Sequence, residues 1–275
     1  MDLLLLLKTI VMGIVEGLTE FLPVSSTGHL IAADALLNFS ASIGGKDVAA
    51  TFEIFIQLGA ILAVVVFFVR DLSDLLRRAV REPAARQVLV NVAAAFVPAA
   101  AIGFLATDFI KGVLFGTPTV GVALIFGGIV MLWVEGRDHR GDTTDVERMS
   151  LRQALTIGAA QILALVPGMS RSATTLIGGL FAGLDRPTAL RFSFYLSIPT
   201  LGIATIYDFI KSRDVISSAA LPMFGVGAAV AFVVALVVVK FFLAWVSRRD
   251  LKPFGWYRIA AGLALLAATA AGYLS

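Results

Sequence analysis

Apolar residues fill long stretches of this chain, and short polar segments separate those stretches at fairly regular intervals. A helix needs about 20 apolar residues to cross the roughly 30 Å hydrocarbon core of a bilayer. Six segments meet this requirement, and we expect each of them to form a transmembrane helix. They are residues 51–69, 88–106, 118–134, 191–210, 219–246 and 255–274.

Two further apolar regions are broken by a proline that small polar residues follow. Residues 3–37 contain Pro23, and residues 153–183 contain Pro167. The pieces after the prolines are too short to span, and irregular backbone at membrane depth occurs only where protein or a watery cavity surrounds it. We therefore interpret both regions as re-entrant helix–loop–helix hairpins. The first arm, residues 3–22, is itself long enough to cross the membrane, so a transmembrane helix is an alternative interpretation of this arm.

The composition supports a membrane protein. Apolar residues make up 59% of the chain and charged residues 15%, whereas soluble domains average about 45–50% and about 25%. The mean hydropathy is +0.92. We expect an all-α integral membrane protein that forms one domain over residues 1–275. The chain has no cysteine, which excludes disulfides, thiolate chemistry and cysteine-based metal sites.

Basic residues are grouped in alternate loops and produce the net charge of +3. Because short basic loops stay cytoplasmic, these charges orient the protein and do not indicate nucleic-acid binding. Both termini and the first hairpin would then be periplasmic, and the second hairpin would open to the cytoplasm; Lys8 argues mildly against this orientation. The basic loops are 70–87, 135–152 and 247–258, and the poorer loops are 38–50, 107–117 and 211–218.

An internal repeat relates the two hairpins. Pro23-Val-Ser-Ser26 and Pro167-Gly-Met-Ser170 share the pattern Pro-x-x-Ser. Each half of the chain, about 1–135 and about 150–275, would contain one hairpin and three spans, and an odd number of spans inverts one half relative to the other. In such folds, sites form at the midplane where broken helices meet. We therefore expect the two loops to approach each other.

Two carboxylates precede the first loop. Glu16 and Glu20 are one helical turn apart and share a face. An ionisable side chain within a membrane costs roughly 2.5–3.5 kcal/mol on insertion scales, and neighbouring carboxylates also repel. Oxygen ligands suit Mg²⁺ or Ca²⁺, so we expect a divalent-metal site or a pair that transfers protons. A polar contact that only holds helices together is the structural alternative.

Hydroxyls and an imidazole follow Pro23. Ser25, Ser26 and Thr27 stand at a helix start, where hydroxyls commonly cap the helix and free N–H groups bind phosphate. His29 lies three residues after Ser26, a spacing that can bring a base to a nucleophile. A histidine with purely structural hydrogen bonds is the alternative.

The second loop adds a fixed positive charge. Arg171 carries a fork of donors that matches phosphate oxygens, and Ser170, Ser172 and Thr175 add hydroxyls. When the two regions are aligned on their prolines, the positions that match Glu16, Glu20 and His29 are alanines in the second region. In the same alignment, Thr27 matches Arg171. This division predicts one composite active site instead of two copies of a binding site.

Several other positions have no assigned role from sequence. Glu53 and Gln57 form a polar pair that either supports the site or links helices, and Asp34 is undecided. Two glycine pairs, Gly127-Gly128 and Gly178-Gly179, are typical of close helix packing. The aromatic residues near span ends are interpreted as interfacial anchors; they are Trp133, Trp245, Trp256 and Tyr257.

These motifs resemble those of the undecaprenyl-diphosphate phosphatase family of bacteria, the bacitracin-resistance type. The resemblance covers Glu16-Gly-Leu-Thr-Glu20, the run Pro23–His29, and Pro167-Gly-Met-Ser-Arg-Ser-Ala-Thr-Thr175. It implies hydrolysis of undecaprenyl diphosphate to undecaprenyl phosphate and inorganic phosphate, which recycles the carrier lipid for peptidoglycan synthesis and gives bacitracin resistance. It also implies a divalent-cation requirement, six spans with two re-entrant hairpins, and a periplasm-facing site in the bacterial inner membrane.

The resemblance also implies roles for individual residues. Glu16 and Glu20 would be catalytic acids or metal ligands, and Arg171 would hold the diphosphate. Ser26 would be the nucleophile and His29 its base. Ser170, Ser172 and Thr175 would line the phosphate pocket. Together with Ser25 and Thr27 at the start of the helix after Pro23, they form the expected phosphate-binding set.

Some alternatives stay open. Water activated by a metal or a glutamate could attack in place of Ser26. A lipid-phosphate transporter would also use inverted repeats with broken helices. A second membrane phosphatase class is rejected, because Ile177 stands where its signature has histidine. The expected partners are a polyprenyl diphosphate lipid and the bilayer, without nucleic acid, and a homodimer is left open.

Overall fold

The computed structural model describes residues 2–106, 110–114, 116–137, 141–212 and 220–274. These residues form helices joined by short loops, without a β-strand in the described ranges. The loops at 107–117, 135–152 and 211–218, which entered the orientation argument, each include residues outside the described ranges.

Five helices of the described chain are long and apolar enough to cross a membrane, so the protein is an all-α, multi-pass membrane protein. Each coincides with a predicted span. The predicted span at 255–274 corresponds to α13 (Lys252–Ala270), a less apolar helix because Lys252 and Arg258 lie in its first two turns. The five are α4 (Lys46–Phe67), α6 (Pro83–Leu105), α8 (Thr117–Glu135), α11 (Arg186–Ser212), with its apolar part at Arg186–Asp208, and α12 (Leu221–Val246).

Prolines set the start of several of these helices. A proline occupies the first turn of α6, α8, α12 and α13. Proline fits there because its fixed φ suits a helix and its missing N–H would have no partner in the first turn. Polar residues before the apolar run also join the helix, which is why α4 and α6 begin five residues before the predicted spans.

The regions around Pro23 and Pro167 each form two helical arms with a loop between them. In the first, α1 (Leu3–Thr19) is followed by α2 (Ser26–Leu37). In the second, α9 (Leu151–Ile162) and a 3-10 turn (Leu163–Leu165) lead to α10 (Arg171–Phe181). With 12 and 11 residues, α2 and α10 are too short to cross a bilayer.

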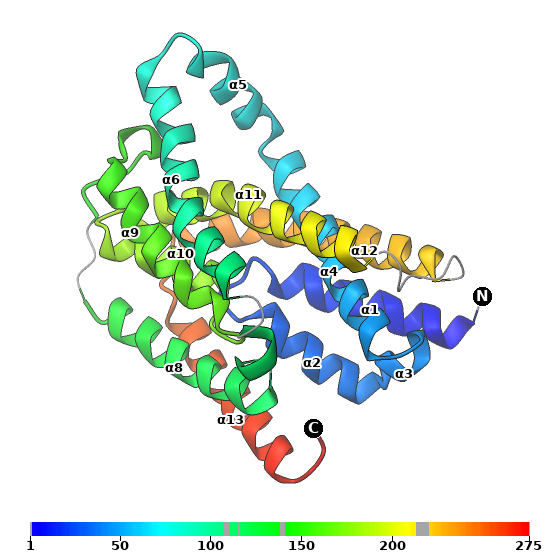
Figure 1. Cartoon of the computed structure of the whole chain (residues 1–275). Coiled ribbons are helices and arrows are strands. Elements are labelled where there is room, and N and C mark those ends of the chain that lie inside the picture. Colours follow the sequence, from blue (N-terminus) through cyan, green and yellow to red (C-terminus); the bar gives the residue numbers. More distant parts are fainter. Residues whose placement is uncertain (1, 107–109, 115, 138–140, 213–219, 275) are drawn as a thin grey trace.

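Helices of the two halves interleave (Figure 1). The first arm α1 packs on α12, and α9 packs on α6, so each arm lies against a helix from the other half. Helix α4 packs on α11 and α12, and α8 packs on α13. Short elements fill the connections: α3 (Phe39–Ile43), α5 (Val69–Ala79), a π-helical turn (Ile110–Leu114) and a 3-10 turn (Val146–Arg148).

The predicted close packing at the glycine pairs is confirmed. A Cβ atom on Gly128 would lie 2.7 Å from the carbonyl oxygen of Gly255, which brings α8 against α13. In the second hairpin, a Cβ on Gly178 would lie 2.7 Å from the Cβ of Ala160. Small residues let helix backbones approach closely in membranes, and here they bring α8, α9 and α13 up to the two loops.

Candidate active site

Both loops end in a serine with an unusual backbone. Ser25 has φ 72° and Ser170 has φ 67°, and each directly precedes a helix, α2 or α10. L-residues other than glycine rarely adopt positive φ, and such strain is found mostly at functional sites. The paired conformations suggest that the two loops are structurally equivalent.

This equivalence corrects the alignment counted from the prolines. One residue separates Pro23 from Ser25, whereas two separate Pro167 from Ser170, and the extra space includes Gly168 with φ 97°. The residue that matches Arg171 is therefore Ser26 and not Thr27. The candidate nucleophile and the candidate phosphate clamp occupy the same position in their respective hairpins.

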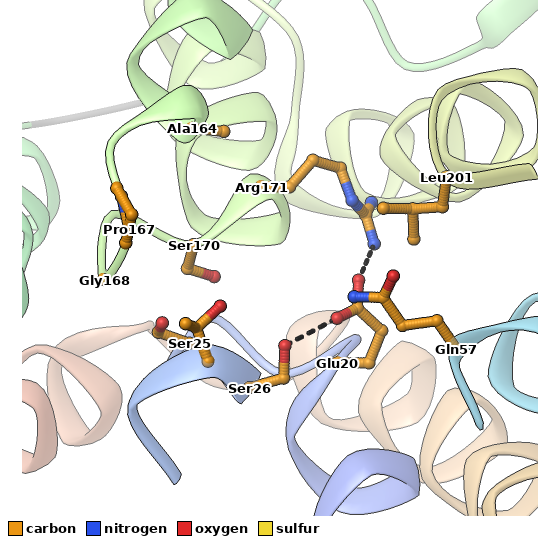
Figure 2. A pocket seen from close by; sticks show the side chains of 11 residues that line it. Glu20, Ser25, Ser26, Gln57, Ala164, Pro167, Gly168, Ser170, Arg171 and Leu201 are labelled. Atoms are coloured by element: carbon orange, nitrogen blue, oxygen red, sulfur yellow. Dashed lines mark hydrogen bonds and ion pairs between the residues drawn. The ribbon is translucent and has the colours of Figure 1, made fainter. Parts of the chain in front are cut away.

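Glu20 joins these two equivalent residues (Figure 2). The hydroxyl of Ser26 donates to Oε2 of Glu20 at 2.7 Å, and Nη2 of Arg171 donates to Oε1 at 3.2 Å. All three side chains are buried. The expected approach of the two loops is therefore confirmed, and one carboxylate makes the connection.

Arg171 is oriented from behind by α11. Its Nη1 donates to the carbonyl and the hydroxyl of Ser193, at 3.3 and 3.4 Å. The Ser193 hydroxyl also shares a 2.6 Å hydrogen bond with Thr175, whose hydroxyl lies 2.8 Å from the carbonyl of Arg171. The Nε–H of Arg171 is buried without a partner in the described chain. Thr175 therefore supports the guanidinium, which keeps a donor for a ligand.

A cavity of about 140 Å³ lies between the loops. Ala164 and Leu201 form part of its wall, and Gln57 reaches it from α4 (Figure 2). Of the residues proposed from sequence, those that line it are Glu20, Ser25, Ser26, Thr27, Ser170 and Arg171. Glu16, His29, Ser172 and Thr175 lie outside its lining.

Ser170 and Ser172 hold the loop backbones. The Ser170 hydroxyl accepts from the N–H of Ala173 at 3.3 Å, which caps α10, and it lies 3.0 Å from the Ser172 hydroxyl. Ser172 donates to the carbonyl of Leu22 in the first loop at 2.8 Å. In α2, by contrast, Ser25 makes no capping bond with its side chain in the described structure, so the first N–H groups of α2 keep their capacity for an anion.

Glu16 is fully buried on α1, and neither of its carboxylate oxygens has a hydrogen-bond partner in the described chain. An ionised carboxylate only accepts, so a hydrogen-bond donor or a cation would satisfy it. The described residues contain no group of three or more histidines or acidic residues arranged to hold a metal. Glu16 and Glu20 are the carboxylates expected to hold a divalent cation, and their oxygen chemistry fits Mg²⁺ or Ca²⁺.

The hydrogen bonds of the His29 ring go to residues other than Ser26, which corrects the predicted pairing. Its Nδ1 lies 2.7 Å from the carbonyl of Ser25 and its Nε2 lies 2.6 Å from the hydroxyl of Tyr257. Since a carbonyl only accepts, Nδ1 carries the proton and Nε2 accepts from Tyr257. The ring also stacks on Tyr257, with centroids 5.6 Å apart. The imidazole turns toward α13, and the Ser26 hydroxyl is bonded to Glu20 instead.

Arg258 was expected in the cytoplasmic loop 247–258, and this prediction is wrong. It lies in the second turn of α13 and is fully buried. Its donors reach the carbonyls of Pro23 at 3.1 Å, Gly168 at 3.0 Å, Met169 at 3.1 Å and Ala123 at 3.4 Å. Residues at the end of a span carry no sequence signal that separates a buried charge from an interfacial one.

Two polar residues whose roles could not be assigned from sequence have hydrogen-bond partners in the structure. Gln57 lines the cavity and also accepts from Thr205 on α11 at 3.4 Å, so it does both things considered for it. Asp34 accepts from the N–H and the hydroxyl of Ser40, both at 2.6 Å, and so stabilises the turn into α3.

Comparison with known proteins adds an independent finding. A family model described as bacitracin resistance protein BacA matches residues 9–264. Undecaprenyl-diphosphatase from Nitrosomonas europaea is 48% identical over 97% of this chain and 95% of its own length. Undecaprenyl-diphosphatase from Dechloromonas aromatica is 47% identical over 100% and 98%, and undecaprenyl-diphosphatase 1 from Chromobacterium violaceum is 46% identical over 95% and 96%.

Proposed function

The chain belongs to the bacitracin resistance protein BacA family, and from this membership we propose that it is an undecaprenyl-diphosphatase. It hydrolyses undecaprenyl diphosphate to undecaprenyl phosphate and inorganic phosphate, which recycles the carrier lipid for peptidoglycan synthesis and gives bacitracin resistance. The observation that carries the proposal is the bridge by which Glu20 holds Ser26 and Arg171 together at one cavity.

The chain binds the diphosphate with groups of both loops. Arg171 offers its free Nε–H and forked N–H groups to the phosphate oxygens, and the uncapped N-terminus of α2 adds backbone donors. Thr27, Ser25 and Ser170 add hydroxyls around the cavity. The bound anion competes with Glu20 for Arg171, so the carboxylate is released where the reaction needs a base.

Ser26 is the nucleophile and Glu20 the general base in this mechanism. The Ser26 oxygen bonds to the terminal phosphorus while its proton passes to Glu20, which is already 2.7 Å away. The bond from that phosphorus to the bridging oxygen breaks, and its electron pair leaves with undecaprenyl phosphate. Glu20 gives that proton to the departing undecaprenyl phosphate. A water molecule then attacks the phosphorus and gives a proton to Glu20, which passes it to the departing Ser26 oxygen, so that inorganic phosphate is released and the Ser26 hydroxyl is restored.

Glu16 and Glu20 would hold the divalent cation. When bound, it would neutralise negative charge on the diphosphate, the main requirement of phosphoryl transfer. The unpartnered oxygens of Glu16 support this assignment.

The proposal also includes the arrangement of the helices in the membrane. Six spans, with α13 as the sixth, and two re-entrant hairpins form inverted repeats at about 1–135 and 150–275. The exchanged packing of α1 on α12 and α9 on α6 supports the repeat, as do the paired serines Ser25 and Ser170. The arginine-rich loops support a bacterial inner-membrane protein with its site facing the periplasm. Because the chain lacks cysteine, labelling of single introduced cysteines from either side of the membrane tests this orientation.

The activity is tested on purified protein in detergent with undecaprenyl diphosphate. We expect phosphate release by the parent, and loss of at least about 100-fold in Ser26→Ala, the usual scale for removing such catalysis. Ser197→Ala is the matched control, since Ser197 is also buried and its hydroxyl donates within its own helix, to the carbonyl of Phe194. A parent protein that binds the lipid without releasing phosphate would indicate a transporter, and an active Ser26→Ala would indicate direct attack by water.

A further inference from the structure

Arg258 is a buried cation that makes no ion pair in the described chain. Its acceptors are four backbone carbonyls, and its Nε–H has no partner among the described residues. Burying a guanidinium without a carboxylate is costly, and carbonyl oxygens only partly replace the lost water. A group retained at such cost, away from the cavity lining, needs a role other than general packing.

The acceptors of Arg258 indicate that role. Pro23 belongs to the first loop, whereas Gly168 and Met169 belong to the second. One guanidinium therefore cross-links two segments that are about 145 residues apart in sequence. A planar fork of donors suits this task, because it holds several acceptors in one fixed arrangement.

The cross-link lies immediately before the reacting groups. Pro23 precedes Ser26 by three residues and Met169 precedes Arg171 by two. The direct bridge through Glu20 must open when the diphosphate takes Arg171. Arg258 does not line the cavity, so a diphosphate bound there does not compete for its bonds to the two loops.

Helix α8 is shaped around this side chain. A Cβ atom on Gly127 would lie 2.2 Å from Nη2 of Arg258 and 2.9 Å from Cζ. A separation that short cannot be accommodated unless the guanidinium moves. Any side chain at Gly127 therefore displaces Arg258, which provides a way to disturb the cross-link from α8.

We propose that Arg258 is a positioning residue that fixes the separation of the two loops and thereby holds Ser26 opposite Arg171. This inference rests on the proposed phosphatase function. It assigns Arg258 no contact with the substrate, so its loss should act on turnover more than on binding.

The kinetic test compares Arg258→Gln, Arg258→Lys and Gly127→Ala with the parent on undecaprenyl diphosphate. We expect each to lower kcat at least about tenfold with KM changed less than about threefold. Lysine should not rescue, because one ammonium cannot replace a fork that spans two loops. Arg248→Gln, in the exposed turn that follows α12, is the control. The double variant Arg258→Gln/Gly127→Ala should be no slower than the slower single variant. The proposal would be overturned if the two substitutions lowered kcat multiplicatively in the double variant. A kcat of Arg258→Gln within about twofold of the parent would also overturn it.

A second readout does not need turnover. In Arg258→Gln, amide hydrogen exchange should rise in both loops, residues 20–26 and 166–172, because they lose a shared restraint. Faster exchange confined to α8 and α13 would mean that Arg258 only packs these helices, and the proposal would then fail. If the parent itself releases no phosphate, the phosphatase function is refuted, while the exchange measurement still decides the cross-link.

Discussion

Replacing Glu16 by methionine is expected to stabilise the protein while removing its activity. Both carboxylate oxygens of Glu16 are buried without a partner in the described chain, and the side chain is 0% exposed. Methionine is similar in length, is apolar and adapts to irregular gaps. The substitution therefore removes a buried polar group without leaving a large cavity.

The expected gain follows from the cost of burying such a group. An unsatisfied buried polar group costs about 1–3 kcal/mol, and an ionisable residue at membrane depth costs roughly 2.5–3.5 kcal/mol on insertion scales. We take about 2–3 kcal/mol as the gain for Glu16→Met. At about 2–4 °C per kcal/mol for a chain of this size, Tm should rise by roughly 4–12 °C.

Glu135→Met is the matched control. The Glu135 side chain is also 0% exposed, but both its oxygens accept from Arg186, at 3.0 and 2.6 Å. Removing it strands a guanidinium that is still 28% exposed, so the loss should be about 2 kcal/mol, below the 3–5 kcal/mol of a fully buried pair. The two substitutions should thus shift Tm in opposite directions.

Thermal unfolding of the purified variants in detergent measures the effect. A chelator should be present throughout, because a bound cation would stabilise the parent and hide the cost of the free carboxylate. Phosphate release, measured separately with cation restored, should be lost in Glu16→Met. A fall in Tm of Glu16→Met would refute the reasoning, since it would mean that the carboxylate is satisfied in the folded protein.

Three further predictions follow from the site and the packing. Glu20→Gln should lower kcat by about 10²–10⁴-fold, the range for general-base catalysis. His29→Gln should lower kcat by less than about tenfold. If a phosphate-release assay shows equal losses for the two variants, His29 would again be the candidate base. Removal of divalent cations by a chelator should stop turnover, and added Mg²⁺ or Ca²⁺ should restore it. The added cation should also raise the Tm of the parent but not that of Glu16→Met. Gly59→Ala should lower Tm by several degrees, because its Cβ would lie 2.1 Å from a carbonyl oxygen of α12, whereas Gly202→Ala, with open space at its Cβ, should not.

Hydrophobic pattern was sufficient for the helices that face lipid. Spans such as α4 and α12 are long runs of apolar residues, and in a bilayer such a run has few alternatives to a helix, because every backbone polar group must be satisfied internally. The prolines at Pro23 and Pro167 similarly predicted where helical arms end. The approach of the two loops was expected from the shared Pro-x-x-Ser pattern, since equivalent interruptions in inverted repeats meet at one depth.

Side-chain partners were less predictable. The spacing of Ser26 and His29 allows a hydrogen bond, yet Tyr257 from the opposite end of the chain takes the imidazole and Glu20 takes the hydroxyl. The sequence likewise does not show that Ser193, within an apolar span, binds Arg171. That contact depends on the packing of α11 against α10. Spacing along one helix determines what can meet, but competing partners from other helices determine what does.

The sequence by itself determined the membrane class, the two broken-helix motifs and the group of residues that carries the chemistry. It could do so because burial of apolar surface in lipid and the cost of charged groups there are local properties of the chain. Only the tertiary structure decided that Ser26 and not Thr27 matches Arg171, that Glu20 bridges the loops, and that Arg258 lies inside the protein. Those outcomes depend on loop geometry and on contacts between residues more than 100 positions apart, which no local pattern records.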